Sequence, residues 1–303
     1  MRSLISRALL SALAFGLLSM PCGAQYVSGY SELSDSDVMK TLKSHVSYLA
    51  SDELGGRKAG SEGEKAAAEY VRDVFREYGV DLLSGDDGDV FGVAQQNGDT
   101  LTSRNVVGFV QGYDRAMYDK YIVIGARLDN IGTNILTVDG KPQTQIFNGA
   151  NGNASGLAVM LELARMISSN AIMFRRSVLF IAFGASEQTF AGAWYFLNRS
   201  FGDAGKIDAM IDLDMLGTGS KGFYAYTSSN ADMNMILSNV SNELQPVLPK
   251  VTAEEPYPSD NRAFYSKEIP SVMFTTGKYP EHGTVKDVES IIEYEPMERE
   301  LEY

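Results

Sequence analysis

The feature that most constrains the fold is an alternation, from Asn105 onward, of short apolar runs with helical stretches. The runs are NVVGFV, YIVIGA, SVLFIAF, AMIDLDM, FYAY and SVMFTT, and helices are expected over 154–166, 191–198 and 233–244, around Ala263 and from Val288. Buried strands that are followed by helices form mostly parallel sheets covered on both faces. The sequence therefore predicts an α/β fold, a three-layer sandwich with a mostly parallel mixed sheet and helices on both faces.

The segment before Asn105 predicts two helices. Apolar residues at helical spacing indicate a helix over 38–49, with Ser34 and Asp35 as candidate N-caps. Ser61 and Glu64 form a capping-box pattern for a second helix that ends at Gly79. Residues 80–98, rich in Gly and Asp, are predicted as turns that lead into strands. No internal repeat and no Pro- or Ser-rich linker divides this region from the rest.

Composition excludes several classes of protein. The chain has 303 residues, a formal net charge of −13, two histidines and one cysteine. One cysteine cannot build a disulfide scaffold or a thiolate zinc site, and an acidic chain does not suit nucleic-acid binding. Two histidines also argue against a histidine-rich metal site.

The N-terminus has the pattern of a secretory signal. Arg2 and Arg7 precede an apolar run over 8–18, and small residues precede Gln25. We therefore expect a signal peptide over 1–24 and a single domain over 25–303, with 303 − 24 = 279 residues and a charge of −13 − 2 = −15. No later run is long enough to span a bilayer, so we expect a bacterial protein that is periplasmic or secreted. A lipoprotein acylated at Cys22 is the second choice, because Pro21 departs from such signals.

Polar residues collect where the predicted strands end. Arg127 and Asp129 follow YIVIGA, Ser186 and Glu187 follow SVLFIAF, and Asp214 follows AMIDL. Ligands of parallel α/β sheets bind outside the carboxyl ends of the strands. An acid after a strand is usually only a cap or a turn residue, but several at consecutive strand ends indicate a site.

Seven ordered segments carry a resemblance to a known family. They are LASDELGGRKAGSEGEKAAAEYV, NVVGFVQG, YIVIGARLDNIG, FNGANGNASGLAVMLELAR, FIAFGASEQTFAGAWYF, AMIDLDMLG and SVMFTTGKYPEHGTVKD. Together they resemble the co-catalytic zinc aminopeptidases, whose relatives include bacterial leucyl aminopeptidases, glutaminyl cyclases and the transferrin receptor ectodomain. The resemblance covers nearly the whole chain after Gln25 and implies a zinc-dependent exopeptidase fold.

The resemblance also implies where a dizinc site would lie. Five side chains hold two zinc ions in that family, and Glu187 and Asp214 match two of those metal-ligand positions. Asp129 matches the aspartate of the family's H-x-D signature. Asp260 matches an aspartate in a loop near the substrate cleft, where Asn261 replaces the usual histidine.

The remaining positions depart from the family pattern. Arg127 stands where the first zinc histidine is expected, Gly152 where the bridging aspartate is expected, and Gly283 at the last histidine, with His282 one residue upstream. Ser186 occupies the position of the general base. An arginine has no lone pair for a metal, and a serine hydroxyl does not accept a proton at neutral pH.

The leading hypothesis is therefore a non-catalytic pseudopeptidase that binds peptides, another ligand or a protein partner without a cofactor. Without metals, Glu187 and Asp214 would be costly buried charges, so we expect Arg127 to form charge-assisted hydrogen bonds to one or both.

Two alternatives stay open. One is an active metallo-aminopeptidase with an atypical site of Asp129, Glu187, Asp214 and His282, which would hold Zn²⁺ or, as mostly oxygen ligands, Ca²⁺ or Mg²⁺. The other is a metal-free hydrolase with Ser186 as nucleophile, although no histidine at a strand end could activate it. His45 and Trp194 are interpreted as structural residues. The stretch after Val288 is shorter than the final helix usual in the family.

Overall fold

The computed structural model describes residues 36–240 and 245–303, and Ser36–Tyr303 form one compact unit. The predicted signal peptide and Cys22 lie outside the described residues, so the processing of the N-terminus stays a prediction. Among the residues described, no helix is both long enough and apolar enough to cross a membrane.

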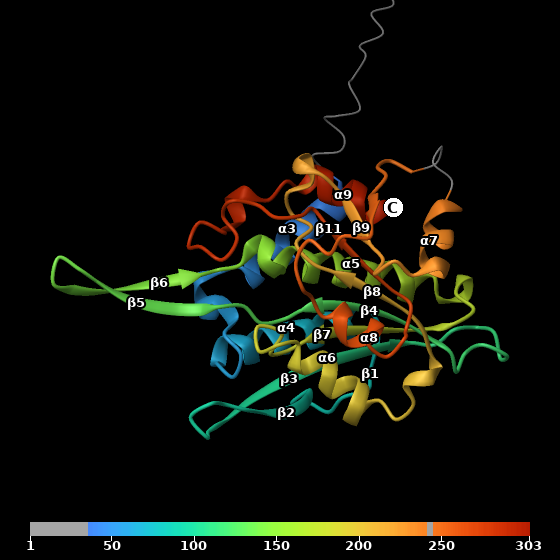
Figure 1. The fold of residues 1–303 in the computed structure, drawn as a ribbon, viewed down its shortest axis with the longest axis horizontal. Helices are drawn as coiled ribbons and strands as arrows, with labels where there is room; N and C mark the ends of the chain where they lie inside the picture. The colour runs from blue at the N-terminus through green and yellow to red at the C-terminus, as the bar shows by residue number, and fades with distance from the viewer. Residues whose placement is uncertain (1–35, 241–244) are drawn as a thin grey trace, which may run out of the picture. The chain divides into compact units, whose positions relative to one another are not determined.

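A mixed, mostly parallel sheet of nine strands forms the centre of the fold (Figure 1). Strand β4 lies parallel to β7 and β8, and β8 lies parallel to β11. Strand β3 pairs antiparallel with β1, β2 and β7, and β9 pairs antiparallel with β11 and parallel with β10. The α/β prediction is confirmed. The strands are β1 Asp81–Leu82, β2 Asp89–Ala94, β3 Thr100–Val110, β4 Tyr121–Arg127, β7 Ser177–Phe183, β8 Ile207–Leu213, β9 Tyr224–Tyr226, β10 Lys250–Thr252 and β11 Ser271–Thr275.

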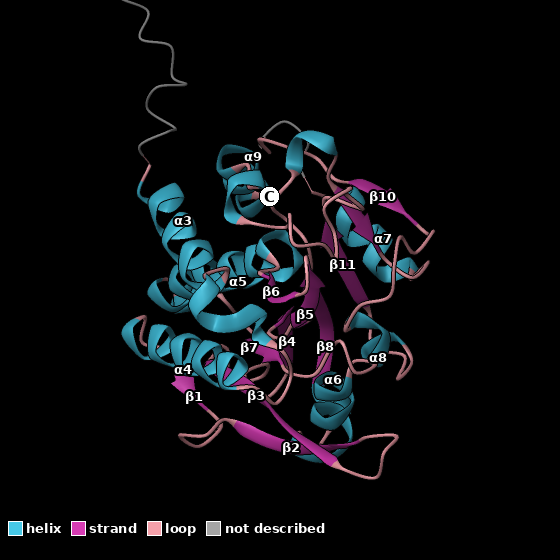
Figure 2. Ribbon diagram, turned by 90° about the vertical axis from the view of Figure 1, so that its left-hand side faces the viewer, coloured by secondary structure: helices cyan, strands magenta, loops and turns pink. Residues whose placement is uncertain are grey.

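Helices cover both faces of this sheet, because alternate residues of the central strands point to opposite sides. Ile124 and Phe180 pack in one core, against α3 (Asp37–Leu49), α4 (Glu62–Glu77), α5 (Ser155–Ser169) and α9 (Tyr294–Glu302). Val123 and Leu179, their neighbours in sequence, pack in a second core with α6 (Ala191–Tyr195) and α8 (Asn261–Tyr265). Figure 2 shows the sheet between these two helical layers.

The helix caps agree in part with the predictions. The hydroxyl of Ser61 accepts a hydrogen bond from Glu64 N, and Gly79 follows α4 with a φ of 71°, as the capping box and stop signal predicted. The N-cap of α3 is Ser36, whose hydroxyl accepts from Met39 N, so the choice of Ser34 or Asp35 was wrong.

Three later boundaries also differ. Helix α7 (Ala231–Ser238) ends before the predicted 244, and residues 241–244 lie outside the described part. A 3₁₀ turn over Glu289–Ile291 and an extended Ile292 precede α9, so the final helix begins at Tyr294 rather than at Val288. Helix α6 is continued by a π-helical turn over Phe196–Ser200.

A two-stranded hairpin between β4 and α5 was not predicted from the sequence. Strands β5 (Gly132–Val138) and β6 (Lys141–Phe147) pair antiparallel and form a separate sheet. Asp139 and Gly140 link them with φ values of 52° and 72°, as a type I′ turn requires. The hairpin projects from the rest of the fold (Figure 1), and both faces of most of its length are exposed.

Candidate functional site

The strand-end residues meet at one edge of the sheet. Arg127 is the last residue of β4, Ser186 and Glu187 follow β7, and Asp214 follows β8. Because β4 lies between β7 and β8 and is parallel to both, these side chains converge.

Arg127 joins the two carboxylates of this group. Its Nη1 donates to Glu187 Oε1 at 2.6 Å, and its Nη2 donates to Asp214 Oδ1 at 3.3 Å. The arginine side chain is 13% exposed, that of Asp214 is 3% exposed and that of Glu187 is 34% exposed. Burial alone would lower the pKa of Arg127, but Asp214, Glu187, Asp129 and Asp260 together outweigh it and raise that pKa. We call Arg127, Glu187 and Asp214 the Arg127 cluster; the contacts expected from the sequence are present.

Asp129 holds the loop that follows β7. Its two carboxylate oxygens accept hydrogen bonds from the backbone nitrogens of Ser186, at 2.7 Å, and Glu187, at 3.2 Å. The residue is fully buried, and burial together with Glu64 raises its pKa to about 7. Asp129 therefore fixes where Ser186 and Glu187 lie.

Ser186 is paired with Asp260, not with a histidine. Its Oγ donates to Asp260 Oδ2 at 2.7 Å, and both residues are buried. Burial, with Asp212 beside it, raises the pKa of Asp260. A buried serine bound to a carboxyl group lacks the imidazole base of a nucleophilic triad.

Two neighbouring residues were not predicted from the sequence. Asp212 is buried, and its Oδ2 accepts from the backbone nitrogen of Asn261 at 3.1 Å. Ser259 donates its hydroxyl to Asp214 Oδ2 at 2.7 Å. Asp214 lies two residues after Asp212, and residues at that spacing in a strand point to the same side. This spacing could have predicted that Asp212 lies near the site.

Gly152 leaves room for an acid from another part of the chain. Its backbone nitrogen donates to Asp287 Oδ2 at 3.1 Å, and Tyr279 donates its hydroxyl to the same oxygen at 2.6 Å. A Cβ at position 152 would lie 3.1 Å from Tyr279 Oη and 3.3 Å from Asp287 Oδ2. Asp287 belongs to the GTVKD stretch of the resemblance but was not singled out there.

The two remaining positions, His282 and Gly283, lie in the loop that follows β11. Gly283 has a φ of +68°, a left-handed conformation that disfavours a side chain at this position. His282 is exposed, and its ring lies 5.5 Å, between centroids, from the ring of Tyr279. Among the described contacts, His282 has no hydrogen bond to Asp129, Glu187 or Asp214.

Arg57 is a second buried cation close to the site, and sequence reasoning missed its role. It is fully buried and donates to the carbonyl oxygens of Leu49, Leu128, Asn148 and Gly149. Burial and the nearby Arg127 lower its pKa to about 10, which leaves it charged at neutral pH. Its position in the quoted LGGRKAG loop was the only signal in the sequence.

His45 is buried and Trp194 is partly buried, which agrees with the structural roles expected from the sequence. The ring of His45 is hydrogen-bonded by the hydroxyl groups of Tyr70 and Tyr78, at 2.8 and 3.3 Å. Trp194 is partly buried against the core between the sheet and α6.

The side chains at this edge do not fit a pair of zinc ions. Glu187 and Asp214 are bound to a guanidinium group, which has no lone pair and repels a metal cation. Asp129 uses both oxygens on backbone amides. Within the described residues, no group of three or more His, Cys, Asp or Glu is placed to hold a metal ion.

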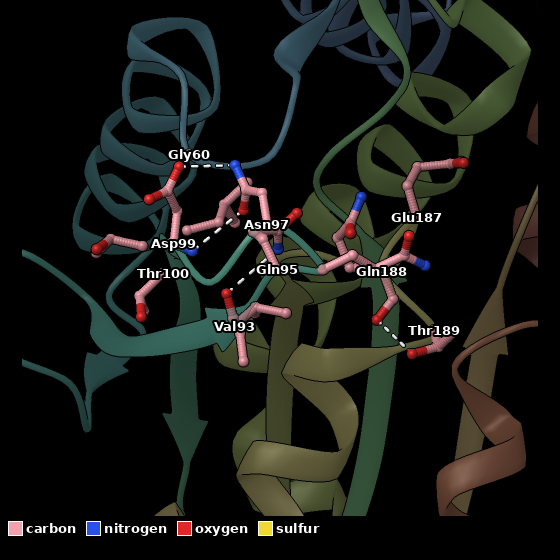
Figure 3. Close-up of a pocket in the computed structure, with 13 residues that line it drawn as sticks. Gly60, Val93, Gln95, Asn97, Asp99, Thr100, Glu187, Gln188 and Thr189 are labelled. Carbon is pink, nitrogen blue, oxygen red and sulfur yellow. Dashed lines mark hydrogen bonds between the residues drawn. The ribbon is translucent and has the colours of Figure 1, made fainter.

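A pocket of about 850 Å³ borders the cluster (Figure 3). It lies between the turn that joins β2 to β3 and the loop over 187–189, and polar uncharged side chains dominate its wall. Glu187 stands at its end, with the carboxylate pointing away from Gln95 and Thr100, and Gln188 lies between them. The polar residues that line it are Gln95, Gln96, Asn97, Asp99, Thr100, Thr102, Glu187, Gln188 and Thr189.

Comparison with known proteins identifies relatives of the chain. Residues 105–300 match the profile of peptidase family M28. Leupeptin-inactivating enzyme 1 of Streptomyces exfoliatus is 24% identical over 194 residues, which cover 62% of this chain and 38% of that enzyme. The chain matches less than half the length of such curated relatives.

Two solved structures show the same fold. An aminopeptidase from Aneurinibacillus sp. strain AM-1 is 18% identical, with a TM-score of 0.68 over 89% of this chain and 92% of that one. A glutaminyl cyclase from Porphyromonas gingivalis is also 18% identical, with a TM-score of 0.66 over 87% of this chain and 95% of that one. At such identities the similarity is evidence for the fold alone.

Proposed function

This chain belongs to peptidase family M28, and on that premise we propose that it is a non-catalytic member: an exported protein that binds the amino end of a peptide. The observation that carries the proposal is the pair of contacts from Arg127 to Glu187 and Asp214. Those two carboxylates match metal-ligand positions of the related zinc enzymes, and the guanidinium takes the cation's place between them.

The position of the general base does not support catalysis either. Ser186 stands at the base position, and its hydroxyl is committed to Asp260. Loss of a general base costs on the order of 10²- to 10⁴-fold in rate. Without a metal, the chain also lacks an activated water and a Lewis acid for peptide hydrolysis.

The charge of the edge favours a cationic ligand. Within the described residues, Arg127 is the only cation that forms an ion pair with Glu187 or Asp214. Glu187 is the most exposed acid of the Arg127 cluster. A peptide ammonium group would pair with Glu187, and amide groups in the adjoining pocket would hydrogen-bond the following peptide units.

A hydrolysis assay tests the loss of activity. The purified full chain should not release nitroaniline from aminoacyl-p-nitroanilides, with or without added Zn²⁺. Hydrolysis that a chelator abolishes and Zn²⁺ restores would instead establish the atypical metallo-aminopeptidase.

A calorimetric titration tests the binding role. Short peptides with a free amino terminus should bind, whereas the same peptides N-acetylated should not, because acetylation removes the charge. Glu187→Gln should weaken binding, and Asp208→Asn, at the opposite end of the sheet on β8, should leave it unchanged. Equal affinity for free and acetylated peptides would contradict the assigned ligand.

A further inference from the structure

The β5–β6 hairpin has two unequal outer edges. In a hairpin with a two-residue turn, the flanking pair Val138 and Lys141 is hydrogen-bonded, and the next pair, Thr137 and Pro142, is not. The nitrogen of Pro142 therefore faces outward, where it cannot donate. Pro142 and the charged Lys141 make the β6 edge a poor template for another strand.

The β5 edge carries no such protection. By the same alternation, the backbone groups of Thr133, Ile135 and Thr137 face outward, and none of the seven residues of β5 is charged or proline. Ile135 is 67% exposed. Within the described residues, β5 pairs only with β6, and an isolated two-stranded ribbon is marginal in water.

We infer that β5 pairs antiparallel with β5 of a second copy of this chain, so that two hairpins form one four-stranded sheet across a twofold axis. The outward-facing residues fix the register. Ile135 lies opposite its own copy, and Thr133 lies opposite Thr137 of the partner subunit. Such a pairing is self-complementary, as a twofold interface requires, and it places β-branched side chains opposite each other.

Charge limits where two copies can make contact and favours the hairpin. The chain carries a net charge of −13, so contact between the bodies of two copies is unfavourable, whereas β5 is neutral and projects away from the body. The register also brings Asp139 of the partner subunit beside Ile131. Lys58 is exposed near Ile131, with its aliphatic stem against Gly132. Its positive charge would pair with the carboxylate of the partner's Asp139.

The assembly would add a wall to the candidate site. Ile131, at the base of the hairpin, is the nearest neighbour of a Cβ built on Gly283, at 3.7 Å. The hairpin tip of the partner subunit, at Asp139 and Gly140, would therefore lie at the rim near Gly283. This inference concerns assembly and does not depend on whether the site hydrolyses peptides.

Proline substitutions give the first test, by sedimentation velocity of the full chain over a concentration series. The parent should dimerise. Ile135→Pro removes an outward N–H from β5 and should shift the protein to monomer. Thr144→Pro, its cross-strand partner, removes the matching outward N–H from β6 and should leave the dimer intact. A monomeric parent, or a dimer that Ile135→Pro does not weaken, would overturn the pairing.

Cysteine cross-linking tests the register in a Cys22→Ser background. Hydrogen-bonded antiparallel partners have Cα atoms about 5.5 Å apart, within the span of a disulfide. Ile135→Cys should therefore form a covalent dimer on mild oxidation. Leu136→Cys should not, because its copies lie on a diagonal about 7–8 Å apart or more. Cross-linking of Leu136→Cys but not Ile135→Cys, or capture of extended peptides by a monomeric chain, would contradict the inference.

Discussion

Arg127 is largely buried, and its charge has a structural role. Its guanidinium neutralises Asp214, which is almost fully buried, and Glu187, which is partly buried. Removing one partner of a buried ion pair leaves an uncompensated charge, which is far more costly than losing a surface pair. The stability of the fold should therefore depend on this one side chain.

Arg127→Met tests that dependence. We expect urea unfolding to show a loss of about 3–5 kcal/mol, because Glu187 and Asp214 lose their cation. Arg262→Met is the matched control: Arg262 pairs with Glu255, but 42% of its side chain is exposed, so the loss should be only about 0–1 kcal/mol. Equal losses in both variants would argue against a structural role for the Arg127 cluster.

Gly152→Asp tests whether Asp287 has taken over the space at position 152. The backbone there, with φ −115°, accepts any residue, but the new carboxylate would start from a Cβ only 3.3 Å from Asp287 Oδ2. We expect a loss of about 1–3 kcal/mol, the range for burying an unpaired charge or crowding a packed site. Gly152→Ala, which adds the Cβ alone, should cost less. Asp287→Asn should recover part of the loss in the double variant, and strict additivity in that cycle would contradict the contact.

At the scale of the elements, the junction of α3 and α4 depends on a neutral histidine. His45 of α3 is 4% exposed and lies between Tyr70 and Tyr78, and burial lowers its pKa from 6.5 to about 4. Between these values the unfolded chain binds a proton that the folded chain does not. The free energy of unfolding should therefore fall as the pH drops from 6.5 to 4.

Denaturant titrations at several pH values check this effect against His45→Gln. The parent should lose up to about 3 kcal/mol relative to the variant across that interval, at 1.36 kcal/mol for each pKa unit. A difference between parent and variant that does not change with pH would show that His45 is not buried in its neutral form.

Helix α9 contains a carboxyl group with the opposite behaviour. Glu300 is 7% exposed, its Oε2 has no hydrogen-bond partner in the described structure, and burial with the nearby Glu293 raises its pKa from 4.5 to about 9. The unfolded chain releases this proton above pH 4.5 and the folded chain keeps it, so folding loses stability as the pH rises. Glu300→Gln should thus stabilise the protein at pH 8, and the gain should vanish near pH 4. A gain of equal size at both pH values would contradict the raised pKa.

At the scale of the whole molecule, local patterns predicted the sheet well. The strand SVLFIAF is buried on both faces. Because such a strand must be apolar along its whole length, it could be predicted from composition alone. The β5–β6 hairpin was missed because it has no buried face to impose a pattern, although its Asp139-Gly140 turn was a usable signal. The boundary of α9 was placed early because local propensity does not show that Ile292 has an extended backbone.

For the site, the sequence predicted which residues come together but not all of the contacts that they make. Arg127, Ser186, Glu187 and Asp214 follow strands, so the topology alone brings them together. The bonds from Ser186 to Asp260 and from Gly152 to Asp287 join residues 74 and 135 positions apart. Such contacts depend on how distant loops pack, which no local pattern contains.

A guanidinium group, rather than a pair of zinc ions, neutralises Glu187 and Asp214 in this structure. The most direct test is the zinc content of the protein, measured by elemental analysis after expression and purification in zinc-supplemented medium. We expect far less than one zinc ion per chain, unchanged by dialysis against a chelator. One or two tightly bound zinc ions per chain would contradict it, because Arg127 could not then occupy the place between these carboxylates.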